Sequence, residues 1–103
     1  MFKIGFYVPP SHLEIVKNAM FRAGAGRIGD YDQCCWQCLG QGQFRPNSQS
    51  QPFIGQPNEL ELLPEYRVEM VCPDNNIHAV MDAMKHAHPY EEPAYDVCTL
   101  VDF

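Results

Sequence analysis

The chain repeats itself at an offset of 64 residues, which carries Pro9 onto Pro73. An internal repeat constrains architecture more strongly than any single residue, because each copy must fold into the same supersecondary unit. Similar apolar residues also coincide at this offset, as Ile4 meets Val68 and Leu13 meets Ile77. The identical pairs are Pro9/Pro73, Val16/Val80, Ala19/Ala83, Met20/Met84 and Ala23/Ala87.

Each copy begins with apolar residues at every second position, over residues 2–8 in the first and 66–72 in the second. A period of two is typical of a half-buried strand. A proline then ends each strand. Both copies continue with apolar residues at helical spacing, over residues 13–23 and 77–87. The repeated unit is therefore predicted to be a strand followed by a helix.

The predicted helix boundaries rest on capping signals. Ser11 and Glu14 have the spacing of a capping box, and Gly24 and Gly26 follow the first helix as terminating residues. In the second copy we expect Asp74 or Asn75 to cap the helix and Pro89 to end it.

Three further segments complete the predicted sheet. Residues 34–44 read as a second strand, residues 60–62 lead into the third, and residues 94–101 form a closing strand. The order is β-α-β-β-α-β, the ferredoxin-like α+β arrangement, with two helices on one face of an antiparallel sheet. At 103 residues the chain supports one hydrophobic core, so residues 1–103 are predicted to be a single domain. The uncovered face of the sheet predicts a homo-oligomer.

Charge and composition exclude several classes of partner. A net charge of −6 with scattered Lys and Arg residues argues against nucleic acid. No apolar run approaches the roughly 20 residues of a membrane helix, so no membrane partner is expected. The N-terminus lacks the features of a secretory signal, which predicts a cytoplasmic protein with reduced cysteines.

Residues 45–58 are rich in Asn, Ser, Gln and Pro and connect the second and third strands. A loop of this length in a compact domain is either functional or a tolerated insertion. Phe53 and Ile54 in its middle suggest at least one packed contact. The loop is therefore a candidate site for a ligand or a protein partner.

The glycine-rich segment of residues 24–32 allows two interpretations. Gly24, Gly26 and Gly29 could expose backbone N–H groups to an anion. The segment follows a helix, however, where carbonyl groups rather than N–H groups point outward. Helix termination and a tight turn are the competing interpretation.

The cysteines at positions 34, 35 and 38 superficially resemble half of a zinc site. In an extended strand Cys34 and Cys38 lie roughly 13 Å apart, at about 3.3 Å per residue, so one chain could not place both on one metal without a bulge or turn. Small buried or half-buried thiols are the alternative. Cys72 aligns with Val8 and is predicted to lie in the core.

Residues 85–96 contain the most unusual stretch, in which Pro89 and Pro93 flank Tyr90-Glu91-Glu92. The two prolines hold the carboxylates in a stiff turn, which suits a binding site. His86 and His88 could share a metal only if the helix ends between them. The alternative is that His88 caps the helix and that Glu91 or Glu92 pairs with a neighbouring subunit. A general acid/base role for the two glutamates lacks an identifiable nucleophile.

Four segments strongly resemble the YqfO-like inserted domain of the NIF-three (Ngg-interacting factor) family. They are G-A-G-R-I-G-D-Y-D-Q-C from Gly24, G-Q-G-Q-F-R-P from Gly40, P-F-I-G from Pro52 and A-H-P-Y-E-E-P-A-Y-D from Ala87. The resemblance runs from about Phe2 to the end of the chain. The positions that match the family's marked residues are Gly24, Gly26, Gly29, Tyr31, Cys34, Gly40, Gly42, His88, Pro89, Tyr90, Glu91, Glu92 and Pro93.

The resemblance implies a PII- and CutA-like fold that commonly assembles as a trimer. In the family, a two-metal centre and a GTP-cyclohydrolase-like label belong to flanking segments that this sequence does not contain, so neither is carried onto its residues. Cys35, Cys38 and Leu39 depart from the family's small hydroxyl or acidic residues and slightly favour metal or redox chemistry here.

Three functions follow as hypotheses, in decreasing order of support. The first is a non-enzymatic oligomeric binding or regulatory module, with ligand contacts from His88, Tyr90, Glu91, Glu92, Gly24, Gly26 and Tyr31. The second is a CutA-like protein that binds copper or zinc, or another divalent ion, through Cys34, Cys38, His86 and His88 of different subunits. The third is an enzyme that uses the acidic pair Glu91 and Glu92 with His88 at a subunit boundary.

Overall fold

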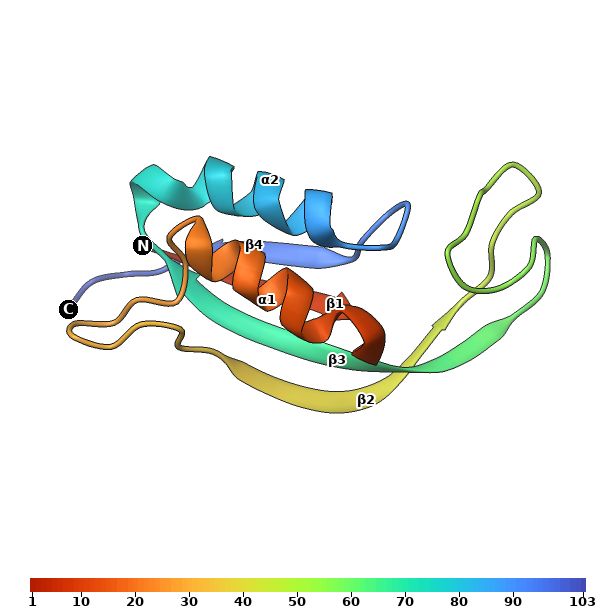
Figure 1. Ribbon diagram of the computed structural model, residues 1–103, viewed down its shortest axis with the longest axis horizontal. Coiled ribbons are helices and arrows are strands. Elements are labelled where there is room, and N and C mark those ends of the chain that lie inside the picture. Colours follow the sequence, from red (N-terminus) through yellow and green to blue (C-terminus); the bar gives the residue numbers. More distant parts are fainter.

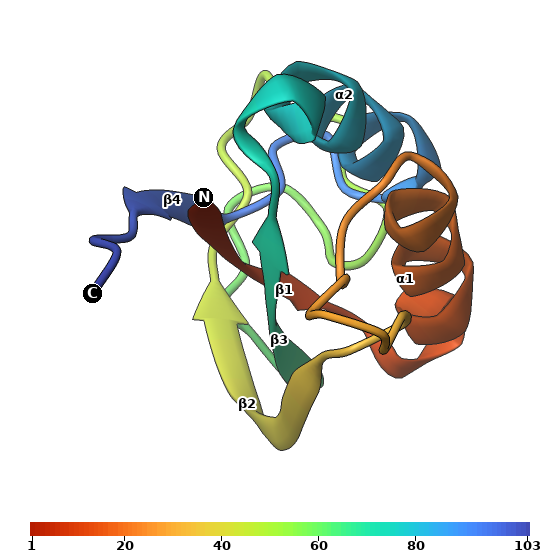
Figure 2. The same ribbon diagram turned by 90° about the vertical axis from the view of Figure 1, so that its left-hand side faces the viewer.

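A computed structural model describes residues 1–103, and its elements follow the predicted order. The strands and helices are β1 (Phe2–Val8), α1 (Leu13–Arg22), β2 (Trp36–Phe44), β3 (Glu61–Cys72), α2 (Ile77–Ala87) and β4 (Tyr95–Thr99). The four strands form one antiparallel sheet in the order β2-β3-β1-β4. Both helices pack on one face of it (Figures 1 and 2). The predicted ferredoxin-like fold is confirmed.

The core lies between the helices and the two central strands, and both copies of the repeat contribute to it. Met20 of α1 and Met84 of α2, which coincide in the repeat, are both fully buried. Cys72 is also fully buried, as its alignment with Val8 predicts, and this burial raises the pKa of its thiol. The core residues are Ile4, Phe6, Val8, Leu13, Val16, Met20, Ala25, Val68, Met70, Cys72, Val80 and Met84.

The helix starts differ from the predicted capping box at Ser11 and the predicted cap at Asp74 or Asn75. Pro10–His12 forms a 3₁₀ turn, and α1 begins at Leu13 without a side-chain cap. Ser11 instead contacts the neighbouring His12, with 2.8 Å between Oγ and Nδ1. The second copy repeats this arrangement, because Asp74–Asn76 forms a 3₁₀ turn before α2 and Asp74 pairs with the N-terminal amine. The extended proline before each turn, Pro9 or Pro73, places the Ser or Asp inside the turn rather than at the N-cap.

Two strands are also shorter than predicted. β2 begins at Trp36 rather than at residue 34, because Gln33 has a positive φ of 54° and the Cys34 N–H donates to the Gly26 carbonyl. β4 ends at Thr99, two residues before the predicted end of the strand.

The β2–β3 hairpin projects beyond the rest of the sheet as an arm (Figure 1). β1 pairs with β3 only from Tyr66 onward, whereas β2 continues to pair with β3 as far as Glu61. The first five residues of β3 therefore have a single neighbouring strand. The loop of residues 45–58 is carried at the end of this arm.

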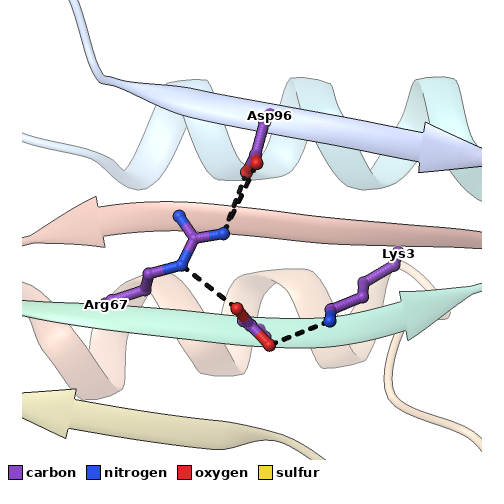
Figure 3. Close-up of polar contacts among 4 residues, drawn as sticks. Lys3, Arg67 and Asp96 are labelled. Atoms are coloured by element: carbon purple, nitrogen blue, oxygen red, sulfur yellow. Dashed lines mark hydrogen bonds and ion pairs between the residues drawn. The ribbon is translucent and has the colours of Figure 1, made fainter.

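The face of the sheet opposite the helices is charged at its centre. Figure 3 shows a chain of ion pairs across three strands, in which Glu69 joins Lys3 to Arg67 and Arg67 continues to Asp96. The N···O distances are 3.1, 3.1 and 3.3 Å. Hydrogen bonds from Lys3 and Arg67 lower the pKa of Glu69. The apolar surface expected on this face is therefore interrupted, and large exposed apolar side chains such as Trp36 and Leu39 lie on the edge strand β2.

Neither helix has the length and hydrophobicity needed to cross a bilayer.

Candidate functional site

The largest hollow in the molecule lies where the hairpin arm approaches the turn after α2. Figure 1 shows the arm bending toward this turn. The hollow, called here the arm pocket, has a volume of about 550 Å³. This falls within the range of small-molecule sites. Its lining residues are Tyr7, Gly42, Gln43, Phe44, Arg45, Pro46, Asn47, Ser50, Pro52, Phe53, Ile54, Glu65, Tyr90, Glu91, Glu92 and Ala94.

The loop wall of the arm pocket is fixed by local and long-range contacts. The Asn58 N–H donates to the Pro46 carbonyl at 2.6 Å and closes the neck of the loop. The Gln51 N–H donates to Glu91 Oε1 at 3.1 Å, which joins the loop to the turn after α2. Phe53 packs edge-on against His12, with 5.4 Å between ring centroids. The loop is thus folded back onto the body of the molecule rather than extended from it.

His88 ends α2 and supports the other wall of the arm pocket from beneath. Its own N–H donates to the Met84 carbonyl at 3.0 Å, and its side chain is only 6% exposed. The ring lies 2.6 Å from the Tyr7 carbonyl through Nε2, and Nδ1 accepts the Tyr90 N–H at 3.1 Å. Since Nδ1 is the acceptor, Nε2 carries the proton and the ring is neutral. Burial lowers the pKa of His88, and the nearby His12 adds to this effect against the opposing hydrogen bond to Tyr7.

Tyr90 extends from this turn into the wall of the arm pocket. Its ring packs 4.9 Å from that of His88 and 6.2 Å from that of Phe44, measured between centroids. Its hydroxyl is buried and makes no hydrogen bond of standard geometry. Burial raises the pKa of Tyr90 well above its usual range, and the neighbouring Glu65 carboxylate raises it further. The Tyr90 hydroxyl and the Glu65 carboxylate therefore interact in the wall of the arm pocket, although not at standard hydrogen-bond geometry.

Glu65 reaches the arm pocket from β3. Its carboxylate lies over Gly42 of β2, where an added Cβ would collide with it. A side chain at position 42 would therefore require the Glu65 carboxylate to move from its present place.

Four side chains that are charged at neutral pH line the arm pocket, and three of them are acidic. Glu65 comes from the arm, Glu91 and Glu92 from the turn, and Arg45 from the start of the loop. Glu91 already accepts the Gln51 N–H, whereas Glu92 has no hydrogen bond within the chain. The structure thus brings together Tyr90, Glu91 and Glu92 of the predicted ligand residues, with His88 directly behind them.

The other predicted ligand residues lie at the opposite end of the sheet. The Gly26 N–H donates to the Val71 carbonyl at 2.8 Å, near the start of β1, whereas the arm pocket adjoins the end of β1. The Gly24 N–H also donates within the chain, and Tyr31, which is 75% exposed, pairs with Ile28 at the base of a tight turn. Gly24, Gly26 and Tyr31 therefore do not meet the His88 turn within one chain, and a meeting across subunits stays a prediction.

The predicted metal ligands are not brought together within the chain. Cys38 stands opposite Arg67 in the sheet and shares the charged face with it, while His86 is an exposed residue of α2 on the other face. Cys34 precedes β2, and both ring nitrogens of His88 are engaged. No three His, Cys, Asp or Glu side chains converge as a metal site. Ligation across subunits stays a prediction, and it would require His88 to give up a hydrogen bond.

Reasoning from the sequence did not assign several lining residues to a site, among them Tyr7, Phe44 and Glu65. Tyr7 occupies an outward position of β1, and Phe44 and Glu65 belong to the two strands of the arm. The strand alternation marks Tyr7 as pointing away from the core but does not mark it as part of a site. Tyr7, Phe44 and Glu65 line the pocket because the arm bends, and no motif in the sequence predicts this bend.

Comparison with known proteins places the chain among longer relatives. A GTP cyclohydrolase 1 type 2 homolog of Mycobacterium leprae is 48% identical over 95 residues, which cover 92% of this chain and 25% of that protein. A crystal structure of a Bacillus cereus protein related to NIF3 is 39% identical, with a TM-score of 0.83 over 98% of this chain and 26% of that one. The chain thus spans about a quarter of the length of these relatives. No family model matches.

The fold alone also resembles a second group of solved structures. The CutA protein of Archaeoglobus fulgidus, described as a periplasmic divalent cation tolerance protein, is 14% identical with a TM-score of 0.69. The alignment covers 100% of this chain and 87% of that structure. The chain is therefore homologous to the inserted region of GTP cyclohydrolase 1 type 2 homologues and NIF3-related proteins, and it has a CutA- and PII-like fold.

Proposed function

We propose that this chain is a non-enzymatic binding or regulatory module whose arm pocket receives a small ligand. The observation that carries the proposal is that the long loop and the turn after α2, far apart in sequence, line one pocket and are joined by the Gln51–Glu91 hydrogen bond. Loops held on a rigid scaffold commonly carry binding sites. A protein partner that contacts the loop is the alternative occupant.

Binding is favoured over catalysis by the state of the ionisable side chains. Both ring nitrogens of His88 are engaged by backbone groups, and one oxygen of Glu91 holds the loop. A catalytic acid or base needs a free position from which to exchange a proton with a substrate. In this proposal His88 and Glu91 support the pocket, and the exposed Glu92 contacts the ligand rather than reacting with it.

A fragment screen followed by amide NMR shifts tests the proposal. Fragments that bind are expected to shift signals from both residues 45–58 and residues 88–94. Removal of residues 47–51, or the change Phe53→Ala, should abolish these shifts. The change Gly29→Asn, at the opposite end of the sheet, is the matched control and should leave them intact. Fragments that shift neither segment, or that bind the deleted chain equally well, would contradict the proposal.

We also propose that the module is a homo-oligomer, with a trimer as the form implied by its PII- and CutA-like fold. All five residues of the edge strand β4 are exposed, and so are seven of the nine residues of the edge strand β2. Exposed edges with apolar side chains are usually covered by a neighbour. Trp36, which is 56% exposed on β2, is the largest such side chain.

A further inference from the structure

The arm pocket combines an acidic lining with aromatic walls. Its charged side chains are Glu65, Glu91 and Glu92 against a single Arg45, so the lining carries an excess of negative charge. This arrangement disfavours phosphates and carboxylates, because an anion in a partly enclosed site would face uncompensated like charge. The net charge of −6 on the whole chain acts in the same direction.

The walls of the arm pocket supply flat apolar surface beside these carboxylates. Phe44 and Tyr90 pack against one another on one side, and Phe53 and Ile54 come from the loop. Aromatic faces attract cations, and a pocket that pairs such faces with carboxylates suits an ammonium or amidinium group attached to an apolar body. Tyr7 is the exception, because Arg67 already occupies its ring face at 5.1 Å.

The hydroxyl of Tyr90 gives an independent indication that a polar ligand group belongs in the arm pocket. It is buried, meets no partner at standard hydrogen-bond geometry, and interacts with the nearby Glu65 carboxylate. A ligand ammonium placed beside these two groups would donate one N–H to the carboxylate and another to the phenol oxygen. Such a contact would supply the hydrogen bond of standard geometry that the buried phenol oxygen lacks in the chain alone.

We infer that the arm pocket binds a small organic cation, with its charged nitrogen near Glu65 and Tyr90 and its apolar body between Phe44 and Phe53. The inference rests on the proposed binding function and names the chemical class of the ligand. Glu65 is the primary counter-charge, since it reaches the pocket from β3 and lies next to the buried hydroxyl. Glu92 adds a second carboxylate at the exposed rim.

Three probes of nearly equal shape test the inference on the 103-residue chain. Benzylamine, which is protonated at neutral pH, benzyl alcohol and benzoate are titrated while amide NMR shifts of residues 45–58 and 88–94 are followed. Benzylamine is expected to bind about tenfold more tightly than the alcohol, as a charged contact in a partly buried site allows. Benzoate is expected to produce no saturable shift.

Matched variants separate the charge of the pocket from the charge of the whole chain. Glu65→Gln should remove most of the preference for benzylamine over the alcohol, and Glu92→Gln should reduce it. Asp82→Asn makes the same change in net charge on the exposed surface of α2 and should leave the preference unchanged.

The outcomes distinguish the ligand class from the binding function. Equal binding of all three probes, or stronger binding of benzoate, would overturn the cation inference while the binding function stands. If none of the three probes shifts the amide signals of residues 45–58 or 88–94, the inference is overturned, and the result also counts against the arm pocket as a ligand site. A preference for benzylamine that survives both glutamate changes would also overturn the inference, because the pocket carboxylates would then not be its cause.

Discussion

His88 connects the end of α2 to the end of β1 through both nitrogens of its ring. The Tyr7 carbonyl and the Tyr90 N–H are backbone groups that would otherwise need other partners, and the ring itself is buried. The sequence allowed His88 to be either a metal ligand or a helix-terminating residue. Its hydrogen bonds agree with a structural role at the helix end, with the additional task of holding the Tyr90 turn in place.

The substitution His88→Ala should therefore be costly. It leaves two backbone groups without partners and opens a cavity, which together should lower the free energy of unfolding by about 3 kcal/mol. Urea denaturation measures this change. His86→Ala is the control, because His86 is exposed on the same helix and should change stability by less than about 0.5 kcal/mol. Equal effects of the two substitutions would contradict the role assigned to His88.

The lowered pKa of His88 also predicts how stability depends on pH. The unfolded chain takes up this proton near the ordinary pKa of 6.5, whereas the folded chain takes it up only at lower pH. The stabilising contribution is therefore complete above pH 6.5 and is lost as the pH falls from there through the lower pKa of the folded state. Thermal melts from neutral to acidic pH should show this loss, and it should be smaller in His88→Gln. An identical pH profile for the variant would contradict the prediction.

At the level of elements, the repeat predicted nearly the whole order of strands and helices, because each element has a local pattern of apolar residues in the sequence. The period-two spacing in β1 and β3 and the helical spacing in α1 and α2 predicted which face of each element is buried. The residues on those faces form the core. The predicted Ser11 capping box and the predicted cap at Asp74 or Asn75 were wrong, because the extended prolines Pro9 and Pro73 lead into 3₁₀ turns. Spacing alone does not record the backbone angles that an N-cap requires.

In the glycine-rich segment after α1, Gly26 and Gly29 should tolerate substitution to different degrees. Gly26 has a φ of 78°, and an added Cβ would press against Phe21 and the Cys34 carbonyl. Gly29 has a φ of 56° with no atom near its Cβ position. Gly26→Ala should therefore lower the free energy of unfolding by about 2 kcal/mol, whereas Gly29→Asn should cost well under about 1 kcal/mol, because Asn tolerates the left-handed region. Denaturation curves of both variants measure the difference, and a reversed order would contradict it.

At the scale of the whole molecule, the sequence identified both halves of the candidate site but not how they meet. The loop of residues 45–58 and the turn at Tyr90 were each recognised from composition and prolines. Their contact depends on the bend of the β2–β3 arm, a property of long-range packing (Figure 1). The predicted ligand contacts combined Gly24, Gly26 and Tyr31, which follow α1, with residues of the turn that follows α2. The antiparallel helices place the ends of α1 and α2 on opposite sides of the molecule instead.

The proposed oligomer predicts a contact through the exposed edge strand. Light scattering coupled to size exclusion should give a mass three times that of the chain. Trp36→Asp should shift the protein to the monomer without unfolding it, because the side chain is exposed and its charged replacement would disfavour burial at an interface. Ile15→Asp is the control, since Ile15 is equally exposed, at 56%, on α1. A monomeric unsubstituted chain, or an unchanged mass for Trp36→Asp, would contradict this proposal.

The central claim is that loop and turn form one binding site, and intermolecular NOEs from bound benzylamine test it most directly. The arrangement predicts NOEs from the ring protons of the probe to Phe53 of the loop and to Tyr90 of the turn in the same sample. NOEs confined to one of these segments, or to the charged face of the sheet around Trp36 and Arg67, would contradict it.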